Sequence, residues 1–159
     1  MGGIARVPVA IALGSNLGDR DAELDEAEDR LAVLLSGAVA SARYETDSVG
    51  GPADAPAYLN EVVVGSTLLA PRPLLEALQA IEIAAGRERP FLNAPRTLDL
   101  DLILYGDFVI DEPGLAVPHP RFRDRLFVLQ PLAEVAGDWV DPVSGQSVQD
   151  LLDRLPPTA

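Results

Sequence analysis

The chain has 159 residues, of which 48% are apolar and 23% charged, a composition typical of one folded domain rather than a disordered segment. Its 25 acidic and 12 basic side chains give a formal charge of −13, which makes nucleic acid and anionic membranes unfavourable partners. The absence of cysteine excludes disulfides, thiolate zinc sites and cysteine nucleophiles, and no apolar run is long enough to span a bilayer, so we expect a cytoplasmic protein.

The first half of the chain predicts a strand, a helix and two more strands. Val7–Leu13 is continuously apolar, as is typical of a central strand buried on both faces. Asp19–Leu35 places leucine and alanine at helical spacing. Val39–Thr46 alternates well enough for a second strand, and Tyr58–Leu68, rich in β-branched residues, predicts a third.

The second half of the chain predicts a helix followed by a strand, then a turn followed by a short helix, and finally a terminal helix. Proline is tolerated in the first turn of a helix and glycine is favoured just past its end, so Pro71 and Gly86 set the bounds of the first predicted helix. The predicted elements are a helix from Pro71 to Gly86, a strand over Leu98–Tyr105, a proline-rich turn at Pro118–Pro120, a short helix over Phe127–Val135 and a terminal helix over Ser147–Leu155.

The order strand, helix, strand, strand, helix, strand is that of the split βαβ pattern. We therefore predict an α+β fold: a ferredoxin-like βαββαβ sheet with helices on both faces, in three layers, and extra C-terminal helices. The sequence shows no repeat and no linker, so residues 1–159 are expected to form a single domain.

Two aspartates share one face of the predicted strand Leu98–Tyr105. Because side chains alternate along a strand, one face should carry a row of leucines directed at the core: Leu98, Leu100, Leu102 and Leu104. Asp99 and Asp101 then share the other face, with Cα atoms roughly 6.5–7 Å apart. Two carboxylates at this separation can converge on bound cations.

Oxygen ligands suit magnesium better than zinc, and two magnesium ions about 3.5–4 Å apart are a common clamp for phosphoryl transfer. Taken alone, an Asp-x-Asp pattern fits the solvated face of an edge strand equally well. Arg96, three residues before Asp99, favours the metal and polyphosphate interpretation because it places a basic group beside the carboxylates.

A second polar group lies on the predicted helix before this strand. Gln79 and Glu82 are three residues apart and so share a helix face. Arg87 and Arg89 follow the helix end, where solvated arginines that interact with the helix dipole are the commoner arrangement. In so acidic a chain, these two arginines and Arg96 nevertheless favour an anion clamp around the aspartates.

Three further residues are candidates for binding. His119 lies between two prolines near a group of arginines that includes Arg125; a turn histidine is more often structural, and only the arginines favour a functional role. Tyr58 and Asn60 share a strand face, and an aromatic ring beside an amide suits a flat heterocycle with donor and acceptor edges. Judged alone, that pair is more often a core tyrosine beside a surface asparagine.

Several segments carry a resemblance to a known family. They are Leu13–Arg20, Tyr58–Asn60, Gln79, Glu82, Gly86–Arg87, Pro95–Leu102, Val117–Pro120, Arg125 and Phe127. Together they resemble the 6-hydroxymethyl-7,8-dihydropterin pyrophosphokinase family of folate biosynthesis, in the family's order and over nearly the whole chain. The run Pro-Arg-Thr-Leu-Asp-Leu-Asp is highly specific to that family.

The resemblance implies a monomeric, magnesium-dependent enzyme that transfers diphosphate from ATP to the hydroxymethyl group of the pterin and releases AMP. Its partners would be these two small molecules, with no nucleic acid and no membrane. The catalytic residues would be Arg87 and Arg96 on a mobile loop, with Asp99 and Asp101 holding two Mg²⁺ ions. The implied ATP contacts are Gln79, Glu82, Arg89, Arg96, Leu102 through its backbone, His119 and Arg125. The pterin would lie between the rings of Tyr58 and Phe127, with polar contacts from Asn60 and Thr46.

The chain departs from the family pattern in the catalytic loop. The family usually has Arg-Trp-Gly before the Pro-Arg-Thr segment, whereas this chain has Leu92-Asn93-Ala94 in a loop one residue shorter, and Gly114 and Ala116 replace a common Arg and Thr. Each lost charge-assisted contact costs about 1.5–3 kcal/mol. We therefore predict weaker ATP binding or slower loop closure, measured as nucleotide affinity and single-turnover rate. Values equal to those of a relative that keeps Arg-Trp would contradict this.

Two other functions stay open on the sequence. The Asp-x-Asp pair could serve a different magnesium phosphotransferase or nucleotidyltransferase. Alternatively, the altered loop could belong to a non-catalytic module that binds a pterin or a nucleotide.

Overall fold

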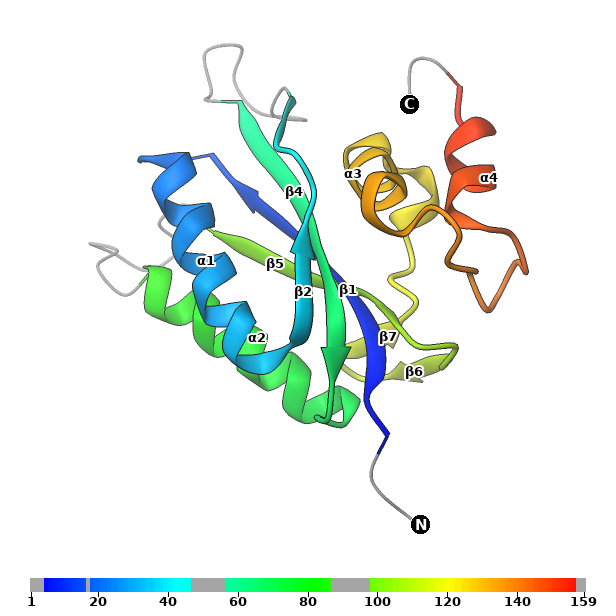
Figure 1. Ribbon diagram of the computed structural model, residues 1–159, viewed down its shortest axis with the longest axis horizontal. Helices are drawn as coiled ribbons and strands as arrows, with labels where there is room; N and C mark the ends of the chain where they lie inside the picture. Colours follow the sequence, from blue (N-terminus) through cyan, green and yellow to red (C-terminus); the bar gives the residue numbers. More distant parts are fainter. Residues whose placement is uncertain (1–4, 17, 47–56, 87–97, 157–159) are drawn as a thin grey trace.

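The structure is a computed structural model, which describes residues 5–16, 18–46, 57–86 and 98–156. Within these ranges, antiparallel strands form one main sheet that lies between two layers of helices (Figure 1). The strands of this sheet are β1 (Val7–Ser15), β2 (Ser36–Ala40), β3 (Tyr44–Thr46), β4 (Tyr58–Thr67) and β5 (Asp99–Tyr105).

The strand order is β2-β4-β1-β5, with β3 also paired to β4. The long strand β1 is central and pairs antiparallel with both β4 and β5. The buried residues Val9, Ala10 and Ile11 have no exposed surface, which confirms the prediction of a central strand covered on both faces. In the sheet path β5 is an edge strand.

In the described part of the chain, four α-helices cover the sheet: α1 (Arg20–Leu34), α2 (Pro71–Gly86), α3 (Leu126–Ala136) and α4 (Val148–Asp153). Helices α1 and α2 pack on one face, where their leucines contact Val9, Ile11 and Leu13. Helices α3 and α4 pack on the other face against Ala10 and Val62. Because side chains alternate along β1, this strand contributes residues to both hydrophobic cores.

Local sequence explains where the first helix begins. Asp19 is its N-cap, and its side chain accepts a hydrogen bond from Ala22 N at 3.1 Å. Leu24, Ala27 and Leu31 recur at helical spacing and are buried. The predicted bounds Asp19–Leu35 are confirmed to within one residue at each end.

The prediction of one continuous strand over Val39–Thr46 is wrong. Ser41 interrupts it, because its hydroxyl accepts the N–H of Val62 at 3.0 Å and takes a position in the ladder of β4. The chain therefore forms β2 and β3 separately. The sequence analysis also missed a hairpin of β6 (Ile110–Glu112) and β7 (Leu115–Val117), which follows β5.

A β-bulge in β5 corrects the predicted row of leucines. Ala10 pairs with Leu104 and Ile11 with Leu102, so Ile103 is an extra residue. Leu98, Leu100 and Leu102 face α1 and α2 as predicted, but Leu104 packs in the core under α3. The bulge reverses the face of every side chain beyond it.

Across the described ranges, no helix combines the length and the apolar character that a membrane crossing requires.

Candidate active site

The aspartates and the predicted pterin-binding residues lie on one face of the sheet, on either side of β1. Gly14 of β1 pairs with Asn60 of β4 and with Asp99 of β5, and Ala12 pairs with Asp101. Residues paired across neighbouring strands point to the same face. Two polar groups that are about 40 residues apart in the sequence therefore become neighbours.

Gly14 lets Asn60 and Tyr58 lie close to the backbone of β1. A Cβ atom at this position would lie 3.3 Å from Asn60 Oδ1 and 3.6 Å from the Tyr58 ring. A longer side chain would therefore compete for the space next to both residues. Gly14 therefore allows the close approach of Asn60 and Tyr58 to β1.

Asn60 and Thr46 form a fixed polar pair. Asn60 is only 6% exposed, and its Nδ2 donates to Thr46 Oγ1 at 2.7 Å. Half-buried Tyr58 is close enough to Asp99 for the carboxylate to raise the pKa of its phenol, in addition to the larger effect of burial. The amide, hydroxyl and ring predicted to bind the acceptor thus lie together beside the first aspartate.

His119 lies near the second aspartate, and its surroundings favour the neutral imidazole. Burial lowers its pKa, Arg125 and Arg121 lower it further, and only the carboxylate of Asp101 opposes them. Its Nδ1 accepts the backbone N–H of Arg121 at 3.2 Å, which leaves the proton on Nε2. Nε2 of His119 can therefore act as a hydrogen-bond donor.

The bulge in β5 also holds this histidine in place. The backbone N–H of His119 donates to the carbonyl of Ile103, the extra residue of the bulge, at 2.9 Å. A non-local backbone contact thus brings His119 beside Asp101.

A cavity of about 290 Å³ opens between the free edge of β5, the β6–β7 hairpin and α2. It is lined by Leu75, Leu100, Asp101, Leu102, Glu112, Gly114, Leu115, Ala116, His119 and Pro120. Its apolar lining residues suit a flat base, and Asp101 and His119 add polar groups to the lining.

Glu82 lies at the edge of β5 and acts on its backbone. Its Oε2 accepts the N–H of Leu100 at 2.8 Å, which satisfies an edge donor between the two aspartates. Gln79 is exposed on the same helix and is not among the residues that line the cavity. The structure therefore brings Glu82 to the site more clearly than Gln79.

Arg125 and Phe127 lie beside each other at the start of α3. The guanidinium of Arg125 stacks over the Phe127 ring, 5.6 Å from its centroid. The preceding turn is fixed by Arg123, which makes a bidentate ion pair with the fully buried Asp141. Arg123 and two further donors hold the pKa of Asp141 at about 2 although burial acts to raise it.

The predicted residues Arg87, Arg89 and Arg96 lie outside the described residues. The roles assigned to them stay predictions.

A family model described as 7,8-dihydro-6-hydroxymethylpterin-pyrophosphokinase matches residues 10–137 of the chain. The chain belongs to this family. Relatives named 2-amino-4-hydroxy-6-hydroxymethyldihydropteridine pyrophosphokinase are 44% identical in Pseudomonas aeruginosa and 42% identical in Synechocystis, each over 151 residues. The first alignment covers 93% of this chain and 91% of the relative, and the second covers 94% and 76%.

The solved structure of wild-type Plasmodium falciparum HPPK-DHPS has the same fold, with a TM-score of 0.76 at 14% identity. The match covers 97% of this chain and 45% of that one, so the chain spans less than half of the solved protein. At this identity the likeness supports the fold alone.

The donor set of this pyrophosphokinase-family chain fits a hard divalent cation. Asp99 and Asp101 offer carboxylate oxygens on one face of β5, and the chain has no cysteine. Within the described residues, no group of three acidic, histidine or cysteine side chains could hold a metal by itself. Two carboxylates that need further oxygen ligands suit magnesium bound together with phosphate.

The sequence analysis missed two parts of the site. The β6–β7 hairpin forms one wall of the cavity, and its signal was the Glu112-Pro-Gly-Leu115 turn between short apolar pairs. The predicted first strand ends at Leu13, although β1 continues through Gly14 to Ser15.

Proposed function

We propose that this chain transfers the terminal diphosphate of ATP to the hydroxymethyl group of 6-hydroxymethyl-7,8-dihydropterin and releases AMP, a step of folate biosynthesis. One observation supports this most strongly: an amide–hydroxyl pair and an aspartate pair share one sheet face on either side of Gly14. Such a site can hold a heterocyclic acceptor next to a polyphosphate. Membership of the family supplies the identity of both substrates.

In this proposal the acceptor lies over Gly14, beside Asn60, Thr46 and Tyr58, with Phe127 as its second ring neighbour. ATP places its base in the cavity along Leu102 and its phosphates toward Asp101 and His119. His119 donates a hydrogen bond from its Nε2–H to a phosphate oxygen, while Arg125 neutralises charge. Gln79, Glu82 and Arg89 complete the nucleotide contacts.

The reaction forms a bond between the acceptor oxygen and the β-phosphorus and breaks the bond from that phosphorus to the α-phosphate oxygen. The hydroxyl proton passes to solvent, and AMP leaves. Asp99 and Asp101 would hold two Mg²⁺ ions, which when bound neutralise phosphate charge and lower the pKa of the hydroxyl. The protein mainly orients both substrates and, through Arg87 and Arg96, balances charge.

We also propose a ferredoxin-like arrangement of the domain, supported by the strand order β2-β4-β1-β5 with both crossover helices on one face. A single domain over residues 1–159, a monomeric state and a cytoplasmic location complete the proposal.

Incubation of the protein with ATP, magnesium and hydroxymethyldihydropterin tests this function. We expect AMP and pterin diphosphate in equal amounts, measured by chromatography, and neither product when the pterin or the magnesium is left out. Release of ADP would indicate a different phosphotransferase. Pterin binding without any product would indicate a non-catalytic module.

A further inference from the structure

The segment that connects β2 to β3 is held by contacts on both faces of the sheet. Ser41 ends the ladder of β2, since its N–H donates to Val62 O at 2.8 Å and its hydroxyl accepts the N–H of Val62. The chain then leaves β4 for two residues and returns as β3. We call residues 41–44 the β2–β3 connection.

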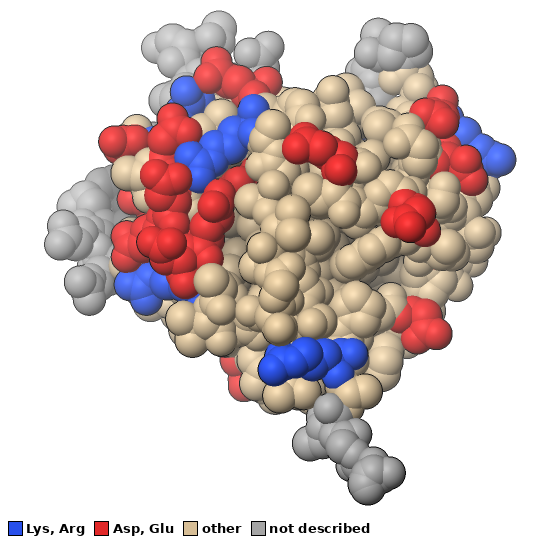
Figure 2. All heavy atoms as spheres, in the orientation of Figure 1, with Lys and Arg blue, Asp and Glu red and all other residues tan. Residues whose placement is uncertain are grey.

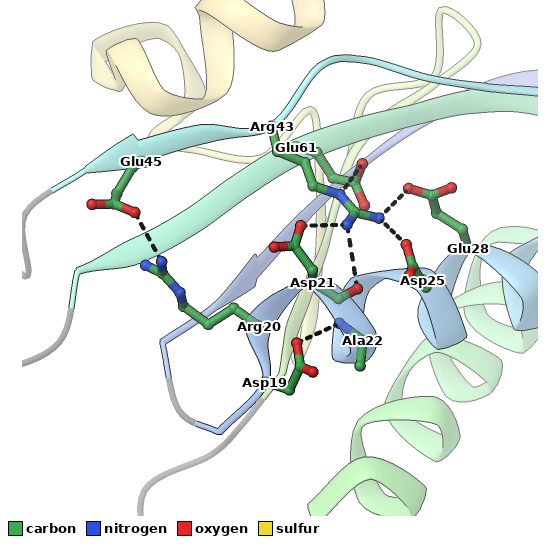
Figure 3. Close-up of polar contacts among 9 residues, drawn as sticks. All are labelled: Asp19, Arg20, Asp21, Ala22, Asp25, Glu28, Arg43, Glu45 and Glu61. Carbon is green, nitrogen blue, oxygen red and sulfur yellow. Dashed lines mark hydrogen bonds and ion pairs between the residues drawn. The ribbon is translucent and has the colours of Figure 1, made fainter.

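On the α1 side, Arg43 holds this connection with all three guanidinium nitrogens (Figure 3). Nη1 lies 2.7 Å from Asp21, and Nη2 lies 2.7 Å from Asp25 and 2.9 Å from Glu28. Below it, Nε is 3.6 Å from Glu61 of β4. Burial disfavours the charge, but the carboxylates outweigh burial and raise the pKa of Arg43 above its ordinary value.

This arginine therefore differs from an ordinary surface ion pair. Its side chain is only 20% exposed, and four carboxyl groups from two elements surround it. Acidic side chains gather over α1 on the surface, with basic ones among them (Figure 2). A half-buried arginine with several partners holds its geometry far better than an exposed pair does.

On the opposite side, Glu134 of α3 holds the same connection. One carboxylate oxygen accepts the N–H of Ala42 at 2.9 Å, and the other accepts the hydroxyl of Tyr44 at 2.6 Å. The hydrogen bond to Glu134 raises the pKa of Tyr44, so its hydroxyl stays a donor. Helix α1 of one layer and helix α3 of the other therefore both hold the β2–β3 connection.

These two anchors lie directly before the acceptor side of the site. β3 has three residues, and its last residue is Thr46, the partner of Asn60. The carbonyl of Tyr44 is also 3.5 Å from Asn60 Nδ2. Because so short a strand makes few ladder bonds, the position of Thr46 depends on what fixes the residues before it.

We propose that Arg43 and Glu134 are positioning residues for the acceptor: they hold the β2–β3 connection from the two faces of the sheet and so keep Thr46 against Asn60. The inference rests on the proposed function for the identity of the acceptor. Neither residue lines the cavity assigned to the nucleotide. Their loss should therefore weaken acceptor binding and spare ATP.

The test uses Arg43→Met and Glu134→Ala in the full chain, with KM measured separately for pterin and for ATP. We expect KM for the pterin to rise by about tenfold, which corresponds to ~1.4 kcal/mol, with KM for ATP within about twofold of the parent value. Glu134→Gln should recover most of the loss, because its amide can still accept from Ala42 and donate to the Tyr44 oxygen.

Two controls remove similar charges elsewhere. Arg30→Met breaks the exposed pair with Glu26 on α1, and Asp138→Ala removes an exposed carboxylate just after α3. Both should leave both KM values unchanged.

An unchanged pterin KM in folded Arg43→Met and Glu134→Ala would overturn the inference. Equal rises in both KM values would also overturn it, since they would indicate a general loss of structure. If either variant does not fold, Arg43→Lys and Tyr44→Phe, which removes one of the two hydrogen bonds to Glu134, decide the matter by the same ratio. Equilibrium binding of the pterin, followed by its fluorescence, separates this inference from the proposed function: a parent protein that binds pterin but releases no AMP contradicts only the function.

Discussion

Asp101→Asn and Asp99→Asn are each expected to lower kcat/KM for diphosphate transfer by about 10²–10³-fold. Asparagine keeps the size of the side chain and removes its charge, so the phosphate-bound cations lose a ligand that neutralises them. The magnesium concentration needed for half of the maximal rate should rise as well. The measurement is the rate of AMP release against magnesium at saturating ATP.

A matched control separates the effect of losing Asp99 or Asp101 from the effect of losing any carboxylate near the same strand. Asp107 is exposed in the turn that follows β5, so Asp107→Asn removes one carboxylate near the same strand and should change the rate by less than about twofold. The urea midpoint of Asp101→Asn without magnesium should stay the same or rise, because one of two like charges has been removed. Retention of more than a tenth of the parental activity in both Asp99→Asn and Asp101→Asn would rule out the proposed metal site.

Glu61→Gln is expected to stabilise the protein by about 2–4 kcal/mol at pH 8 and to change its stability little at pH 5. Glu61 is 1% exposed, and within the described residues its carboxyl oxygens have no hydrogen-bond partner. Burial, with a smaller contribution from Glu28, raises its pKa from 4.5 to about 8, and only Arg43 opposes the shift. Asp21 and Asp25, which also bind Arg43, weaken that opposition.

A raised pKa means that the folded state binds this proton more tightly than the unfolded chain does. The stabilisation from the proton is complete below about pH 4.5 and is lost as the pH rises through about 8. The loss is about 1.36 kcal/mol for each pH unit within that window. Glutamine has no proton to lose, so the advantage of the variant should grow between these two pH values.

Urea unfolding of both proteins at pH 5 and pH 8 measures this difference. Glu26→Gln, in the exposed pair with Arg30, is the matched control and should change the free energy of unfolding by less than about 0.5 kcal/mol at either pH. A difference between Glu61→Gln and the parent that does not depend on pH would show that Glu61 is ionised throughout.

Much of the site could be predicted from residue spacing because the alternation of a strand is local. Asp99 and Asp101, two residues apart, had to share a face of any strand that contained them, and so did Tyr58 and Asn60. Helix bounds were equally accessible, since Asp19 and the spaced apolar residues of α1 act within a few turns.

The failures came from interactions between distant residues. The side chain of Ser41 takes a backbone donor of Val62, which divides the second strand in two, and no local pattern indicates this contact. Leu104 followed the leucine spacing but turned to the other core because β5 gained a bulge against β1. Glu61 is a charged residue in the apolar sequence of strand β4, and the sequence analysis assigned it no partner.

By itself the sequence determined the composition of the domain, the type of most of its elements and the faces on which the polar pairs lie, since each depends on backbone periodicity and short-range chemistry. Only the tertiary structure decided that the two polar pairs share one surface on either side of Gly14 and that His119 lies near Asp101. It also decided that Arg43 and Glu134 both hold the β2–β3 connection. Those outcomes depend on strand register and on which helix covers which face. Both are set by the packing of residues far apart in the chain, which no local window contains.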